Sequence, residues 1–244
     1  IKRIIRIVFY NIKRGVNIEK MEETSNSVMI VNKENIIQKL IKVFWIFLIG
    51  SILGYIIEMI VGLVQNGHFV SRQGLLFGPF IQVYGVGLVA YYLVISNIKK
   101  KSYIKIFFIT MLLGGIVEYL FSYLQETWFG TISWDYSNLL FNIHGRTSLL
   151  HCLYWGTGGV LFVKFVLPLI NYLKDWCKNT NFKCITAFLV LFIAFDIIIS
   201  GMAGARQLER KNNIAANGYI DNFFDEYYPD AKLEQIYSNA KTVN

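Results

Sequence analysis

The sequence predicts an all-α, polytopic integral membrane bundle of about five transmembrane helices, and three observations support this fold class. Hydrophobic residues make up 55% of the 244 residues, with a mean hydropathy of +0.44. Charged residues make up only 16%, against about a quarter in soluble domains. The apolar residues also gather in five long runs, which leaves too few polar residues to cover a soluble domain.

Each run reaches the roughly 20 residues that a helix needs to cross the hydrocarbon core. Because a helix satisfies its own backbone hydrogen bonds in lipid, each run predicts one span. The runs are 40–64, 77–96, 103–124, 148–170 and 184–205. They define a transmembrane domain, residues 40–205, between a basic cytoplasmic N-terminal segment, residues 1–39, and a polar, mildly acidic C-terminal tail, residues 206–244.

The positions of Lys and Arg predict an N-inside, C-outside orientation in the plasma membrane. The N-terminal segment is rich in both, and the connections after the second and fourth runs carry Lys99, Lys100, Lys101, Lys105, Lys174, Lys178 and Lys183. The connections after the first and third runs carry only Arg72 and Arg146. This pattern accounts for the net charge of +8. No basic stripe interleaved with aromatic residues indicates nucleic acid as a partner. Residues 1–20 fit either an amphipathic interfacial helix or sequence upstream of the start codon.

Ionisable residues within the runs are costly in lipid and therefore need an explanation. Glu58, Glu118 and His151 fall near the outer ends of their helices, and Asp196 lies just past the middle of the fifth. Three interpretations remain open. Glu58 and Glu118 pair with Arg72 and Arg146 to hold the bundle together, or these groups line a polar cavity open to the outer side, or the carboxylates simply face water.

The connection between the third and fourth runs is aromatic and apolar, yet it is interrupted by polar residues and glycines. It includes Trp134, Asp135, Tyr136 and Asn142. Trp and Tyr favour the membrane interface. The same segment could instead re-enter the bundle, where non-helical backbone is tolerated against protein or a water-filled cavity.

Several short motifs occur in order over about residues 40–171. They are Gly54-Tyr55-x-x-Glu58, Ser71-Arg72-Gln73-Gly74-Leu75, Gly78-Pro79-Phe80, Val83-Tyr84-Gly85, Glu118-Tyr119, Trp134-Asp135-Tyr136-Ser137, Gly145-Arg146 and Trp155-Gly156. In these the chain resembles the bacterial ABC-transporter permease family of type IV (CmpB type). Gln82 departs from the pattern, where proline is expected before Val-Tyr-Gly. The fifth run lies outside the resemblance.

The resemblance implies a permease-like membrane subunit that works with a separate ATPase, since the chain has no G-x-x-x-x-G-K-[ST] motif. A homo-oligomer is left open. The residues expected to line a substrate pathway in the outer half of the membrane are Glu58, Arg72, Gln73, Tyr84, Glu118, Trp134, Asp135, Tyr136, Asn142, Arg146 and His151.

Two other functions remain open, although the sequence contains no recognised catalytic motif. The first is a membrane-embedded enzyme acting on a lipid or envelope substrate, with Glu58 or Glu118 as general base. The second is a structural or sensory membrane protein. We expect no cofactor and no metal, because neither the three cysteines nor the three histidines have a standard ligand spacing.

Overall fold

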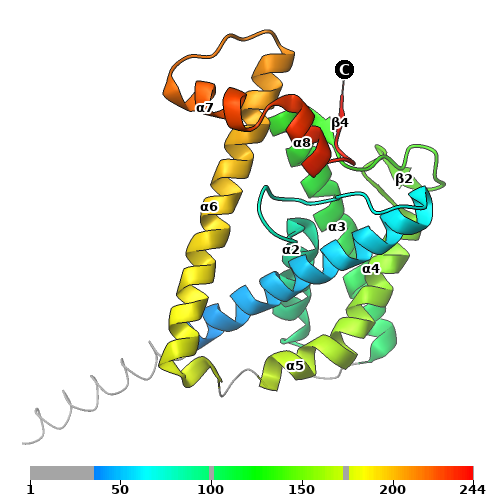
Figure 1. Cartoon of the computed structure of the whole chain (residues 1–244). Coiled ribbons are helices and arrows are strands. Elements are labelled where there is room, and N and C mark those ends of the chain that lie inside the picture. The colour runs from blue at the N-terminus through cyan, green and yellow to red at the C-terminus, as the bar shows by residue number, and fades with distance from the viewer. Residues whose placement is uncertain (1–35, 99–101, 173–175, 244) are drawn as a thin grey trace, which may run out of the picture.

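The computed structural model describes residues 36–98, 102–172 and 176–243. In these residues, four helices are long and apolar enough to cross a membrane: Ile36–Asn66, α3 (Tyr103–Phe129), Leu149–Ile170 and α6 (Thr180–Lys211). Leu149–Ile170 comprises α4 (Leu149–Leu161), a π-helical turn (Phe162–Val166) and most of α5 (Leu167–Tyr172). The all-α membrane class is therefore confirmed (Figure 1). Most of the basic N-terminal segment and Lys99, Lys100, Lys101 and Lys174 lie outside the described residues.

The second expected span, residues 77–96, is only partly helical. Helix α2 begins at Gln82 and ends at Ile95, and its 14 residues extend about 21 Å, short of the roughly 30 Å hydrocarbon core. Two residues explain the late start. Gly78 adopts a left-handed φ of 77°, and Pro79 disfavours helical backbone in the residue before it. The expectation of a full helix from Phe77 was wrong.

The non-helical segment before α2, residues 67–81, makes its hydrogen bonds with protein. Gly74 N–H donates to the Phe80 carbonyl (3.0 Å). The side chains of Gln73 and Gln82 donate to the carbonyls of Gly78 and Gly74, both at 3.0 Å. Gln82 therefore has a structural role where the family pattern led us to expect proline. Non-helical backbone at membrane depth requires such partners.

Small residues allow the helices to approach closely. In the α3–α4 pair, Gly114 lies against the Trp155 side chain and Gly159 against Thr110. Between the first helix and α2, Gly54 lies directly beneath the Tyr84 ring. A methyl group at any of these three glycines would overlap its neighbour, so these small residues set the helix spacing.

The connection between α3 and α4 contains three short strands: β1 (Thr131–Ile132), β2 (Asn142–Ile143) and β3 (Thr147–Ser148). Strands β2 and β3 pair antiparallel with Asn142 opposite Ser148. The turn between them has left-handed backbone at His144 and Gly145. A side chain at Gly145 would also meet Ser137 and Asp135. This hairpin positions residues 134–147 against the end of α3.

Residues 212–243, part of the expected polar tail, fold back over one end of the bundle, and we call them the cap. The cap contains α7 (Tyr219–Tyr227), α8 (Asp230–Ile236) and β4 (Lys241–Thr242). Strand β4 pairs antiparallel with β1, and Tyr237 forms a β-bridge with Arg72. The cap therefore joins the segment before α2 to the α3–α4 connection (Figure 1).

Candidate functional site

The first part of the candidate site is Glu58, which lies on the first helix. One carboxylate oxygen forms an ion pair with Arg72 at 3.1 Å, and the other accepts a hydrogen bond from the Tyr84 hydroxyl at 2.8 Å. Arg72 also donates to the Gln65 side chain at 2.8 Å. The side chains of Glu58 and Arg72 are 25% and 17% exposed. The expected Glu58–Arg72 pair is therefore present, and it is partly accessible.

The second part is Glu118, which is buried on α3. Its carboxylate accepts hydrogen bonds from Thr147 (2.7 Å) and from Tyr136 (3.1 Å), and the Trp155 side chain also lies close to it. No lysine or arginine in the described ranges forms an ion pair with it. Uncharged groups therefore surround a buried acid.

Arg146, the partner of Glu118 under one of the interpretations left open, pairs with Glu126 instead, at 2.5 Å. Its guanidinium also lies over the rings of Tyr119 and Tyr123, 5.8 and 5.4 Å from their centroids. Glu126 is eight residues beyond Glu118, or about 12 Å further along the helix. The position of the β2–β3 hairpin at the end of α3 places Arg146 beside Glu126, so the Glu118–Arg146 pairing was wrong.

Aromatic side chains bring the two acids into one cluster. The Tyr84 ring lies 5.4 Å from that of Trp155, and the Tyr136 ring stacks on His151 at 3.7 Å. Both acids interact electrostatically with Tyr84 and Tyr136, and they also interact with each other. We call this set the acid–aromatic cluster, and its members are Glu58, Tyr84, Glu118, Tyr136, His151 and Trp155.

Tyr136 enters the cluster from the α3–α4 connection. Burial, followed by the nearby Glu118 carboxylate, raises the pKa of the Tyr136 phenol above its ordinary value of 10.0. The phenol therefore stays protonated near neutral pH and can donate to Glu118. This contact is evidence that part of the connection faces the bundle, as one of the two interpretations of this segment requires.

The other predicted pathway residues shape the loops. Trp134 donates to the Arg146 carbonyl at 2.8 Å. Exposed Asp135 accepts hydrogen bonds from the hydroxyl and backbone N–H of Ser137, and these lower its pKa. Asn142 donates to the carbonyls of Ser137 and Leu139 and accepts from Gly145 N–H. The Gln73 side chain donates a hydrogen bond to the Gly78 carbonyl. None of these contacts reaches the two acids.

The sequence reasoning left two contributors out of its site list. Trp155 was present only within the Trp155-Gly156 motif, and the glycines opposite its ring, Gly87 and Gly114, are the signal that could have placed it. Thr147 donates the shortest hydrogen bond to Glu118 among those with a stated distance. A threonine in a hairpin carries no sequence signal for this role.

A family model described as "Putative ABC-transporter type IV" matches residues 45–201. The chain belongs to this family. The matched region contains every member of the acid–aromatic cluster and continues into α6, beyond the resemblance at about residues 40–171. Asp196, which that resemblance left out, lies inside the family region. No curated protein and no solved structure matches the chain.

The α6 part of the family region supports the non-helical segment. The Asp196 carboxylate accepts a hydrogen bond from Phe77 N–H at 3.1 Å, and Ser200 accepts one from Leu76 N–H at 2.8 Å. The Ser200 hydroxyl also donates to Asp196 at 3.1 Å. Asp196 is fully buried. These two side chains bind backbone that would otherwise be unsatisfied, which gives Asp196 a structural reason to lie within a span.

Proposed function

We propose that this chain is the membrane subunit of an ABC-type transporter, and that the acid–aromatic cluster is its substrate-binding site in the outer half of the membrane. Membership of the family and the long apolar helices support a transporter-like membrane protein. ATP hydrolysis would come from a separate ATPase polypeptide, because the chain has no P-loop motif.

The observation that carries the proposal is the state of Glu118. A buried carboxylate without an ion partner is costly, so a structural acid is normally paired or, like Asp196, accepts a hydrogen bond from backbone that would otherwise be unsatisfied. Among the described residues, Glu118 has only uncharged donors, although Arg146 lies on the same α3–α4 connection as the donors Thr147 and Tyr136. The cluster therefore keeps one acid available for a ligand.

The charges of the cluster favour a cationic substrate. Glu58 and Arg72 offset each other, so Glu118 would give the site one net negative charge when it is ionised. Tyr84, Tyr136 and Trp155 add aromatic surfaces that attract cations. The substrate class that fits is a small monovalent cation, such as a protonated amine.

Lysine positions support the outer placement of the site. The basic N-terminal segment and the connection after α2 would face the cytoplasm under the positive-inside rule. The cluster lies toward the opposite end, where the β2–β3 hairpin supplies Thr147. Residues 67–81 together with α2 would complete the second crossing, which keeps the N-inside, C-outside orientation.

The first test is a thermal-shift measurement on the full chain in nanodiscs with tetramethylammonium and a series of primary amines. We expect these cations to stabilise the wild-type protein and to have no effect on Glu118→Gln. Glu126→Gln is the matched control, because it removes a carboxylate from the same helix outside the cluster, and it should keep the response. An equal response of wild-type protein and Glu118→Gln would contradict the proposed site.

The second test is labelling of single cysteines in intact cells with a membrane-impermeant maleimide. Ser71→Cys and Ser137→Cys report on the end of the bundle that carries the cap, in a background lacking the native cysteines. We expect both to react from outside. Protection of both positions until the membrane is permeabilised would overturn the orientation and the outer placement of the site.

A further inference from the structure

Helix α7 has an apolar face that the described part of the chain leaves uncovered. Tyr219, Ile220, Phe223 and Tyr227 are 96%, 58%, 42% and 52% exposed. Their spacing places them on one side of the helix. Phe224 turns inward and packs with Leu76 and Leu233. Four exposed apolar or aromatic side chains on nine residues are unusual for a surface that faces only water.

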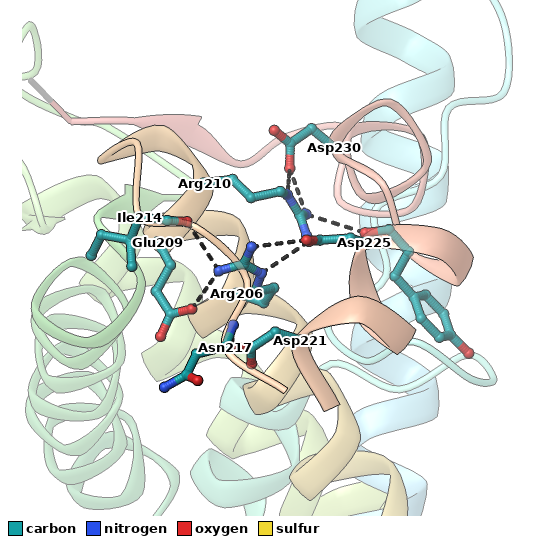
Figure 2. Close-up of polar contacts among 9 residues, drawn as sticks. Arg206, Glu209, Arg210, Ile214, Asn217, Asp221, Asp225 and Asp230 are labelled. Atoms are coloured by element: carbon teal, nitrogen blue, oxygen red, sulfur yellow. Dashed lines mark hydrogen bonds and ion pairs between the residues drawn. The ribbon is translucent and has the colours of Figure 1, made fainter. Parts of the chain in front are cut away.

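The polar side of α7 is held against α6 by ion pairs. Arg206 pairs with Asp225 at 2.8 Å, and Arg210 pairs with Asp225 and Asp230 at 2.7 and 2.5 Å (Figure 2). Asp221 accepts a hydrogen bond from Asn217 N–H, which closes the turn before α7. These contacts fix the rotation of α7, and its apolar face is therefore directed away from the arginines.

A groove of about 290 Å³ lies between this face and α6. Its eight lining residues are all apolar or aromatic, among them Phe195, Ile198 and Met202 of α6 and Tyr219, Ile220 and Phe223 of α7. No charged side chain lines it. The groove therefore suits an apolar occupant.

The groove continues a surface of α6 that faces lipid. Phe188, Leu191, Phe195 and Ile198 are 54–71% exposed and recur every three or four residues, which places them on one face of a spanning helix. Phe195 and Ile198 belong both to this face and to the groove. An acyl chain packed along α6 would reach the groove without crossing a polar surface.

We propose that a membrane phospholipid places one acyl chain in the groove between α6 and α7, and that α7 lies in the membrane interface. Its two tyrosines belong to the residue types that favour this depth, and amphipathic helices bind there through their apolar face. Arg206 and Arg210 of α6 bind the acidic side of α7 and form the first attachment of this helix. The contact between its apolar face and lipid would give the cap a second attachment.

Fluorescence quenching tests the proposal on the full chain in nanodiscs. A bimane label is placed at Ile198→Cys, at Ile220→Cys or at the control Asn222→Cys on the polar side of α7, in a cysteine-free background. The phospholipid carries a nitroxide on its acyl chain. We expect several-fold stronger quenching at Ile198 and Ile220 than at Asn222. Quenching at Ile220 no stronger than at Asn222 would overturn the interfacial position.

Lipid retention tests the occupancy of the groove independently. We expect native mass spectrometry of the detergent-purified protein to detect a bound phospholipid, which Phe223→Asp reduces several-fold and Asn222→Asp does not. Equal retention in all three proteins would overturn the acyl-chain site. Quenching of the Ile220 label by a nitroxide-labelled second copy of the chain, without lipid nitroxide, would identify a protein occupant and also overturn it.

Discussion

At the residue scale, the two acids of the cluster differ in how they are stabilised. Glu58 has a cation, Arg72, at 3.1 Å and a phenol at 2.8 Å. Glu118 is more deeply buried, and its donors in the described part of the chain are uncharged. Removing the charge should therefore cost more stability at Glu58 than at Glu118, whereas ligand binding should depend on the charge of Glu118.

We predict that Glu58→Gln lowers the free energy of unfolding by about 1–3 kcal/mol, because it leaves the half-buried Arg72 without its ion pair. Glu118→Gln should cost less than about 1 kcal/mol, since an amide can still bond to Thr147 and Tyr136. Thermal or denaturant unfolding in detergent measures both. A larger loss for Glu118→Gln than for Glu58→Gln would assign Glu118 a structural role.

At the element scale, packing and backbone satisfaction decide where the helices lie. Gly54 allows Tyr84 of α2 to cross the first helix and reach Glu58. Asp196 and Ser200 of α6 bind the backbone before α2. The position of Tyr84 in the cluster therefore depends on contacts from two neighbouring helices.

Gly54→Ala should destabilise the fold by about 1–3 kcal/mol, because the new methyl group would overlap the Tyr84 ring. Gly158→Ala and Gly201→Ala are matched controls, since no neighbouring atom of the described residues lies within 4 Å of a methyl group at either helical position. They should unfold at or above the wild-type temperature. Equal behaviour of Gly54→Ala and the two controls would show that this close contact does not constrain the bundle.

Asp196→Leu should cost about 1–3 kcal/mol, because the N–H of Phe77 and the hydroxyl of Ser200 lose their acceptor inside the bundle. Asp196→Asn retains a carbonyl acceptor and should be close to wild type. The two melting temperatures, compared in the same detergent, separate lost hydrogen bonding from lost charge. Equal loss in both variants would mean that the charge itself is required.

At the scale of the whole molecule, the cap joins elements that are distant in the sequence. It contacts the segment before α2 through the Arg72–Tyr237 bridge and the α3–α4 connection through the β1–β4 pair. Its anchors on α6 are the bidentate pair Arg206–Asp225 and the contacts of Arg210 (Figure 2). The cap should therefore detach when these ion pairs are removed.

Low pH should weaken the attachment of the cap to α6. Hydrogen bonds from Arg206, and then from Arg210, lower the pKa of Asp225 from 3.8 to about 2, although burial opposes them. A group with a lowered folded-state pKa stabilises the fold above its unfolded value and loses that contribution as the pH falls toward the folded value. We expect the cap to be held above about pH 4 and to loosen between pH 4 and pH 2.

Protease sensitivity of the cap at neutral pH provides the control for this prediction. Asp225→Asn should increase cleavage within residues 212–243 without acid. A disulfide between Thr131→Cys and Thr242→Cys, which are opposite each other in the β1–β4 register, should restore protection. An Asp225→Asn cap as resistant as the wild type would show that the ion pairs do not hold it.

The sequence by itself determined the membrane class, four of the long helices and the ionisable residues that lie within them. Apolar length and backbone satisfaction in lipid are local properties, so they can be read from the runs. Gly78 and Pro79 were also visible in the sequence, and helix α2 begins only after them, at Gln82.

Only the tertiary structure decided which charges meet. The same sequence pattern allowed Arg146 to pair with Glu118 or with Glu126, and the position of the β2–β3 hairpin selected Glu126. The tertiary structure also brought Tyr84, Trp155 and Tyr136 close to the two acids and folded the cap over α6. These contacts join residues far apart in the chain, and their geometry depends on helix spacing that no local pattern encodes.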